Sequence, residues 1–245
     1  MKIGGLSKTT LLDYPQHVAA TIFTEGCNFR CPFCHNAGLL GGGKADETDT
    51  AYEAEEVQQA PYSVEQVLAF LQKRKGILQG VCITGGEPTL QSDLPAFIRS
   101  IKQLGYLVKL DTNGYQPEVL RRLLQEGLLD YIAMDVKNSR EKYGITVGKR
   151  DLDTGMIHES IGLIRTSGIN YEFRTTIVAE LHTREDLLAI GRWLQGSRAY
   201  YLQSYRDNEN VLCQGYHAYP DAVIKEWAKL LTGYCDIVET RGIEG

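Results

Sequence analysis

The sequence predicts an α/β fold in which six β/α units build an open or closed barrel. Two observations support this prediction. Short apolar and β-branched runs alternate along the chain with segments of helical periodicity. Several of these runs are continuously apolar, which is typical of parallel strands covered by helices on both faces. In such a fold the functional side chains are expected at the C-terminal ends of the strands.

Each predicted element has its own local signals. The predicted strands are Val18–Phe23, Val81–Thr84, Tyr106–Asp111, Tyr131–Val136, Tyr171–Ile177 and Tyr200–Ser204. The residues at which helices are expected to begin favour helix N-termini, and they are Ser63, Ser92, Pro117, Thr154, Thr183 and Pro220. The first of these opens Ser63-Val64-Glu65-Gln66, a capping-box pattern. Glycines after the first four helices indicate where those helices end.

Length and composition indicate one ordinary domain over residues 1–245. Its interruption is the Gly-rich, acidic interval 41–60, which we interpret as a solvated loop, with partner docking as the alternative. A net charge of −5 argues against nucleic-acid binding through phosphate neutralisation. No apolar stretch reaches the roughly 18 residues that span a bilayer, and the N-terminus lacks the apolar segment of a secretion signal. We therefore expect a cytoplasmic protein that binds no membrane.

Three of the six cysteines, Cys27, Cys31 and Cys34, follow the first predicted strand in one loop. Their spacing lets the loop wrap three thiolates around one metal centre, and thiolates suit both zinc and iron–sulfur clusters. A structural zinc site needs four ligands. Neighbouring His35 is poorly placed to join Cys34 on one tetrahedral ion, and no second CxxC lies downstream. The count favours a cluster with one open iron, and a zinc-binding regulatory or interaction module remains the alternative.

The motif Cys-x3-Cys-x2-Cys after the first strand of a β/α barrel resembles the signature of the radical S-adenosylmethionine (SAM) superfamily. The wider segment, residues 24–36 with the sequence TEGCNFRCPFCHN, is similar to the activating enzymes of glycyl-radical enzymes. This resemblance implies a partial (β/α)6 TIM-like barrel and a [4Fe-4S] cluster on the three cysteines. It also implies that SAM binds the open iron and is cleaved to methionine and a 5′-deoxyadenosyl radical. Phe33 and His35, which flank Cys34, are assigned to cofactor binding on the same basis.

Motifs at later strand ends extend the resemblance. Gly85, Gly86 and Glu87 begin a GGEP motif that is expected to hold the SAM amino group, although a Gly-Gly corner alone is weak support. Asp111 and Thr112 belong to DTNG, and Met134, Asp135 and Lys137 to an (M/L)DxK motif. The resemblance places Asp111, Thr112, Met134 and Asp135 around a monovalent cation, and Asp135 and Lys137 against SAM.

Two more strands complete the expected site. Arg174 lies among apolar residues of the fifth strand, where it needs a partner. A SAM carboxylate would be a suitable bidentate partner, and a structural ion pair is the alternative. Gln203 lies in an LQ-type motif that is expected to bind the SAM ribose or adenine, although a histidine serves near this position in related pyruvate formate-lyase activators.

The opening segment Gly4–Pro15 is most similar to activators of anaerobic ribonucleoside-triphosphate reductase. The resemblance implies hydrogen abstraction from a glycine of such a glycyl-radical enzyme, with electrons from a flavodoxin or ferredoxin-type donor. The alternatives are a pyruvate formate-lyase activating enzyme and a small-molecule radical SAM enzyme of the 7-carboxy-7-deazaguanine synthase type.

Overall fold

The computed structural model describes residues 1–41, 62–207 and 210–243, so most of the predicted acidic loop 41–60 lies outside the described residues. The described residues form two compact units. Unit 1 comprises residues 1–28, 36–112 and 118–132, and unit 2 comprises residues 29–35, 113–117 and 133–245. The chain passes between the units several times, so neither unit is one continuous segment. The prediction of a single domain stays a prediction.

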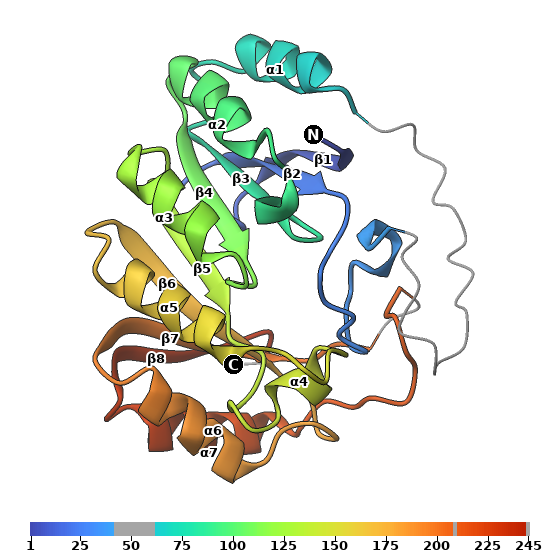
Figure 1. Ribbon diagram of the computed structural model, residues 1–245, viewed down its shortest axis with the longest axis vertical. Helices are drawn as coiled ribbons and strands as arrows, with labels where there is room; N and C mark the ends of the chain where they lie inside the picture. The colour runs from blue at the N-terminus through green and yellow to red at the C-terminus, as the bar shows by residue number, and fades with distance from the viewer. Residues whose placement is uncertain (42–61, 208–209, 244–245) are drawn as a thin grey trace. The chain divides into compact units, whose positions relative to one another are not determined.

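Unit 1 carries the blue-to-green part of the chain in Figure 1. Its elements are β1 (Ile3–Thr10), β2 (Ala19–Thr24), η1 (Ala37–Leu39), α1 (Val64–Lys73), β3 (Gly80–Gly85), η2 (Pro88–Leu90), α2 (Leu94–Gln103), β4 (Leu107–Thr112) and most of α3 (Pro117–Gln125). Strand β1 pairs antiparallel with β2, whereas β2–β3 and β3–β4 are parallel. The predicted capping box of Ser63 is confirmed. The Ser63 side chain accepts a hydrogen bond from the backbone N–H of Gln66, and the Gln66 side chain accepts one from the backbone N–H of Ser63.

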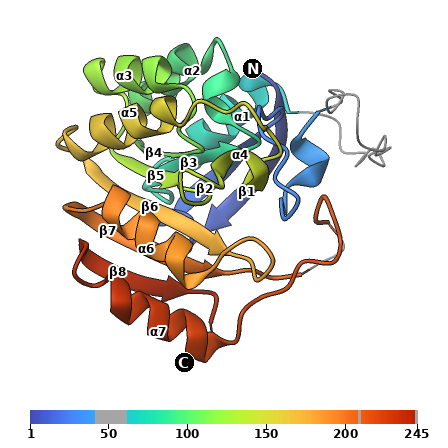
Figure 2. The ribbon, with the colours of Figure 1, turned by 60° about the horizontal axis from the view of Figure 1, so that its bottom comes forward.

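Unit 2 carries the yellow-to-red elements, and Figure 2 shows β6, β7 and β8 side by side with α6 and α7 next to them. Its elements are α4 (Tyr143–Thr146), α5 (Thr154–Arg165), β6 (Asn170–Ile177), α6 (Arg184–Trp193), β7 (Ser197–Ser204), α7 (Asp221–Leu231) and β8 (Cys235–Arg241). Strand β5 (Tyr131–Asp135) begins in unit 1 and ends in unit 2. The pairs β6–β7 and β7–β8 are parallel.

The strands follow one another in the sheet in chain order, from β1 to β8. All six predicted strands are present, as β2 to β7, with boundaries within a few residues of the expected ones. The structure adds β1 and β8, which are the two ends of this order and which the sequence pattern did not indicate. Buried apolar side chains such as Ile22, Ile83, Leu110, Phe173 and Leu202 fill the strands, as expected for a helix-covered parallel sheet.

Candidate functional site

In unit 1 the GGEP turn after β3 packs against the residues that follow β2 through backbone contacts. Gly86 N–H donates to the carbonyl of Thr24 at 2.8 Å, and Glu87 N–H donates to the carbonyl of Gly26 at 2.7 Å. A Cβ on Gly86 would lie 2.1 Å from the oxygen of Gly26, which no side chain can tolerate. Gly85 adopts a φ of 118°. The two glycines therefore permit a close approach to the segment that leads into Cys27.

Glu87 joins this turn to the end of β4. Its side chain is buried, with 1% exposure, and one carboxylate oxygen accepts hydrogen bonds from Thr89 and from the hydroxyl of Thr112 at 2.7 Å. Asp111, the residue before Thr112, is paired with the buried ammonium of Lys109. Glu87 of the GGEP motif and Thr112 of the DTNG motif are thus brought together within unit 1.

Unit 2 contains the second half of the cysteine loop, residues 29–35, whereas Cys27 belongs to unit 1. Arg30 N–H donates to the carbonyl of Val147 at 2.8 Å, just after α4. On the other side, Leu212 N–H donates to Cys34 and Cys213 N–H donates to Pro32, at 3.2 and 2.8 Å. Backbone bonds to two distant segments therefore fix the conformation of the loop around Cys31 and Cys34.

The side chains around Cys34 differ in exposure. Phe33 is buried and makes part of the packed interior, while His35 is exposed and places its ring edge-on to Tyr205 with centroids 5.5 Å apart. Although His35 is exposed at the surface, partial desolvation of its ring and then the charge of Lys137 lower its pKa, which favours the neutral imidazole near pH 7. A neutral ring can accept a hydrogen bond on one nitrogen and donate one on the other.

The end of β5 places a carboxylate between two cations. Asp135 accepts from Arg174 Nε at 2.8 Å through one oxygen and from Lys137 Nζ at 3.0 Å through the other. Burial alone would raise the pKa of Asp135, but Arg174 and Lys137 outweigh it and hold the pKa well below its usual range. Burial would also lower the pKa of Lys137, but Asp135 first, and the Cys31 sulfur next, raise it instead.

Tyr143 links the cysteine loop to the (M/L)DxK motif in unit 2, because its ring lies 6.4 Å from that of Phe29 and its hydroxyl donates to the carbonyl of Asp135 at 3.4 Å. Cys31 is a buried free cysteine, and cysteine binds metals as the thiolate. Arg174 thus has the protein partner that the sequence left open, an ion pair with Asp135. The cations Lys137 and Arg174 against Asp135 leave a positive excess, which fits a ligand that carries a carboxylate.

Two charged residues that the sequence did not indicate adjoin this triad. Glu172, with 1% exposure, accepts both arms of the Arg241 guanidinium at 2.7 and 2.8 Å, and Arg174 Nη1 lies 4.0 Å from the same carboxylate. The alternation Glu172-x-Arg174 in one strand was a usable signal, because it puts both side chains on one face. Arg241 could not be found, since β8 itself was not predicted.

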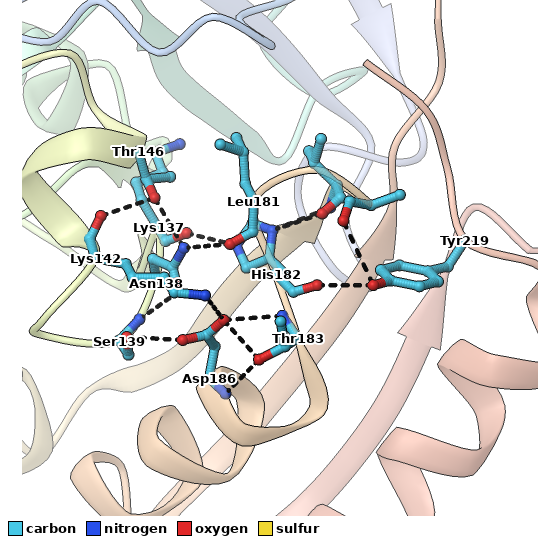
Figure 3. A network of polar contacts seen from close by, with 12 residues as sticks. Lys137, Asn138, Ser139, Lys142, Thr146, Leu181, His182, Thr183, Asp186 and Tyr219 are labelled. Atoms are coloured by element: carbon cyan, nitrogen blue, oxygen red, sulfur yellow. Dashed lines mark hydrogen bonds and ion pairs between the residues drawn. The ribbon is translucent and has the colours of Figure 1, made fainter.

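A buried polar network stabilises the segment that follows β5 (Figure 3). The carbonyl of Lys137 accepts from Nε2 of the fully buried His182 at 2.8 Å, and Nδ1 accepts from the N–H of Val178 at 3.1 Å. Asn138 donates to Thr146 and to the carbonyl of Leu181. Asp186 accepts from Ser139, Lys142 and Thr183. The exits of β5 and β6 are therefore bound to each other directly after Lys137.

The remaining predicted residues are also placed. Met134 is buried, and its methyl group occupies the space that a Cβ on Gly114 would need, at 2.1 Å. Gly114, with φ 74°, thus admits Met134 beside the end of the DTNG motif. Gln203 is half-buried in β7, opposite Thr176 of β6 and Arg241 of β8 in the strand register.

Comparison with known proteins identifies the family. The model of the radical SAM superfamily matches residues 21–194, so the chain belongs to this superfamily. The family implies a [4Fe-4S] cluster and SAM, and the chain is accordingly an enzyme of the radical SAM oxidoreductase class. The three free thiols of one loop, whose conformation around Cys31 and Cys34 is fixed by backbone hydrogen bonds, fit the cluster. In the described residues, no helix is long and apolar enough to cross a membrane.

Relatives refine this picture. The chain is 30% identical over 250 residues to a Methanocaldococcus jannaschii protein named provisionally as a glycyl-radical enzyme activating enzyme, covering 99% of this chain and 97% of that protein. It is 32% identical over 125 residues to the 7-carboxy-7-deazaguanine synthase of Thermococcus kodakarensis, covering 48% of each. Among solved structures, SuiB of Streptococcus suis bound to SAM is similar, with TM-score 0.64, 14% identity and 90% of this chain covered. The chain spans about half the length of SuiB (49%), and this likeness confirms the predicted α/β fold of the radical SAM type.

Proposed function

We propose that the chain is an activase that installs a glycyl radical in a partner enzyme. In this reaction SAM accepts one electron and its C5′–S bond breaks, which yields methionine and a 5′-deoxyadenosyl radical. The radical then takes one hydrogen atom from the Cα of a partner glycine, which leaves 5′-deoxyadenosine and a glycyl radical. The partner is thus a protein substrate, and the electron comes from a flavodoxin or ferredoxin-type donor.

The observation that supports this proposal most strongly is similarity over the full length of a relative named as an activase. That similarity covers 99% of this chain, whereas the 7-carboxy-7-deazaguanine synthase match covers 48%. Shared cofactor motifs explain a half-length match, because all enzymes of the superfamily bind the same cofactors. A match that extends over the remaining residues favours a shared substrate class as well.

Cys27, Cys31 and Cys34 are the proposed cluster ligands, and the cluster when bound supplies the electron for SAM cleavage. The Gly85-Gly86-Glu87 turn offers backbone groups to the SAM amino group. Residues that we assign to SAM contacts or to the pocket around it are Phe33, His35, Asp111, Thr112, Asp135, Lys137, Arg174 and Gln203. We also propose a monovalent cation on Asp111, Thr112, Met134 and Asp135.

The partner that the sequence favours is anaerobic ribonucleoside-triphosphate reductase, on the basis of residues 4–15. Most of this segment forms β1, the antiparallel strand beside β2. The residues that resemble the reductase activators thus lie mostly in β1, which is not one of the parallel-paired strands that carry the cofactor motifs. This placement supports a role in distinguishing activase subtypes rather than in SAM chemistry.

The test is glycyl-radical formation under anaerobic conditions. The reconstituted, reduced chain is mixed with SAM and with the anaerobic reductase from the same genome, and the sample is frozen for EPR spectroscopy. We expect a doublet from the glycyl Cα hydrogen that collapses to a singlet when the partner is labelled with glycine deuterated at Cα. SAM cleavage with no doublet from either that reductase or a pyruvate formate-lyase would contradict the activase function and favour a small-molecule substrate.

Matched cysteine variants test the ligand assignment in the same experiment. Cys31→Ala is expected to lose the cluster, SAM cleavage and the doublet together. Cys235→Ala removes a buried thiol that contacts the carbonyl of Leu194 in unit 2, and it should retain all three. Retained cleavage in Cys31→Ala would refute its role as a ligand.

A further inference from the structure

Five charged side chains of alternating sign form a continuous chain through unit 2. In order they are Lys137, Asp135, Arg174, Glu172 and Arg241, and they come from the segment after β5, from β5, from β6 and from β8. Three of the four links are close: Lys137 lies 3.0 Å from Asp135, Arg174 lies 2.8 Å from Asp135, and Arg241 lies 2.7 Å from Glu172. The link between Arg174 and Glu172 is longer, at 4.0 Å. Arg174 therefore has two carboxylates within reach and lies closer to Asp135 than to Glu172.

Which carboxylate Arg174 pairs with depends on whether Glu172 already has another cation as its partner. Its carboxylate is 1% exposed, so water cannot compensate its charge, and both of its oxygens are occupied by Arg241. A buried carboxylate that lost this partner would carry a large desolvation cost. Arg174, the nearest remaining cation along this chain of charges, would then be drawn from Asp135 toward Glu172.

We propose that Arg241 is a positioning residue that saturates Glu172 and thereby keeps Arg174 on Asp135, where Arg174 faces the SAM carboxylate. The inference rests on the proposed function only in that last respect. Arg241 acts through Glu172 and Arg174 and is not itself placed against the cofactor.

The contacts of Arg241 with its neighbours suit the proposed positioning role. Its guanidinium stacks on the ring of Tyr201, with 3.6 Å between Cζ and the ring centroid, and the strand register puts it opposite Gln203. Stacking holds the guanidinium plane while its two arms bind both oxygens of Glu172. A lysine would offer a single point charge and no planar fork, so Arg241→Lys should position Arg174 less well than the wild type.

Three variants test the proposal through SAM affinity, measured by equilibrium dialysis of labelled SAM with the cluster-loaded protein. Arg241→Met keeps the length and the contact with Tyr201 but removes the charge, and we expect about tenfold weaker SAM binding, or about 1.4 kcal/mol. Glu172→Gln removes the competing charge, so Arg174 stays on Asp135 and affinity should remain within about twofold of wild type. The double variant should likewise recover most of the affinity lost in Arg241→Met.

The different SAM affinities expected for Arg241→Met and Glu172→Gln distinguish a positioning role from a purely structural ion pair, a strut that joins β6 to β8. A strut loses the same ion pair in either single variant, so equal losses of affinity for Arg241→Met and Glu172→Gln would overturn the proposal. Leu231→Ala, which removes a buried side chain of α7 in the same unit, is the stability control and should lower the melting temperature with unchanged SAM affinity.

Failure of the inference and failure of the proposed function give different results. A wild-type protein that binds no SAM would contradict the proposed function. A wild type that binds SAM, with Arg241→Met binding it equally well, would contradict only the positioning role of Arg241. The EPR spectrum of the reduced cluster gives a second readout, because SAM binding is expected to shift it. The shift should occur at lower SAM concentration in the wild type and in Glu172→Gln than in Arg241→Met.

Discussion

Each unit holds its own proposed cofactor-binding residues, and the two units do so by different physical means. In unit 1 the GGEP turn is shaped by backbone contacts that only glycine permits, as at Gly86 against Gly26. In unit 2 the side chains around Asp135 are held by a chain of charges and by the buried network shown in Figure 3. A backbone-shaped turn is sensitive to added volume, whereas an ionic chain is sensitive to added or removed charge. Substitutions that add volume should therefore destabilise the turn in unit 1, and substitutions that change charge should destabilise the ionic chain in unit 2.

The largest effect is expected from Asp135→Asn in the ionic chain. Neutralising Asp135 removes the carboxylate that Arg174 and Lys137 share, and the unfolding free energy should fall by about 3 kcal/mol. Asp130→Asn is the matched control in unit 1, because Asp130 pairs with Lys102 and its side chain has the same 28% exposure as Asp135. This second change should cost about 1 kcal/mol or less. Urea unfolding measures both, and equal losses would contradict the importance of the charge chain.

The next effect probes the backbone-shaped turn. Gly86→Ala would push a methyl group into the oxygen of Gly26, so we expect a loss of about 1–3 kcal/mol in stability and a marked loss of SAM cleavage. Gly162→Ala adds the same methyl group within helix α5, where nothing lies within 4 Å of it, and should stabilise the protein by up to about 1 kcal/mol. Unfolding curves and 5′-deoxyadenosine yields distinguish the two variants. A Gly86→Ala protein with wild-type cleavage would show that the close approach is dispensable.

A pH dependence belongs to the buried network of unit 2. Burial lowers the pKa of His182, so the folded state binds fewer protons than the unfolded state just below pH 6.5. Stability from this residue is therefore present at neutral pH and is lost as the pH falls below 6.5, with a slope of at most about 1.4 kcal/mol per pH unit. His182→Gln should flatten that slope, whereas His158→Gln, on an exposed helix surface, should leave it unchanged. Unfolding free energies from pH 7.5 to 5 provide the measurement.

The smallest effects concern two helix caps, one in each unit. Ser63→Ala removes the cap of α1 and should cost about 1 kcal/mol. Thr183→Ala removes the cap of α6 and also a bond of 2.9 Å to the buried Asp186, so its cost should be larger by a few tenths of a kcal/mol. Thermal unfolding of the two variants compares them directly. A larger loss for Ser63→Ala would show that the network of unit 2 adds nothing to its cap.

Sequence patterns predicted the interior of the fold better than its edges. The strands β2 to β7 are apolar runs between glycine turns, and all were predicted. Strand β1 contains Gly4 and Gly5 and ends in four polar residues, while β8 mixes polar and apolar residues without alternation and has one buried residue, Cys235. Both strands are the ends of the sheet order, where burial on two faces is not required.

The candidate site shows the same limit. Each motif lies at the end of a predicted strand, so residues such as Glu87, Asp135 and Arg174 could be named from their positions. The partners of these residues depend on long-range pairing, as with Glu172 and Arg241, which are separated by 69 positions. No local pattern records such a pairing, and Arg241 lies in the strand that was missed.

The most direct test of the account is cofactor content and SAM cleavage in one anaerobic preparation of the wild type and Cys31→Ala. We expect a brown wild-type protein with about four iron and four sulfide per chain, which releases 5′-deoxyadenosine and methionine when reduced with SAM. Cys31→Ala should show neither the full iron content nor the cleavage. A colourless wild-type protein with a single zinc, or undiminished cleavage by Cys31→Ala, would contradict the account.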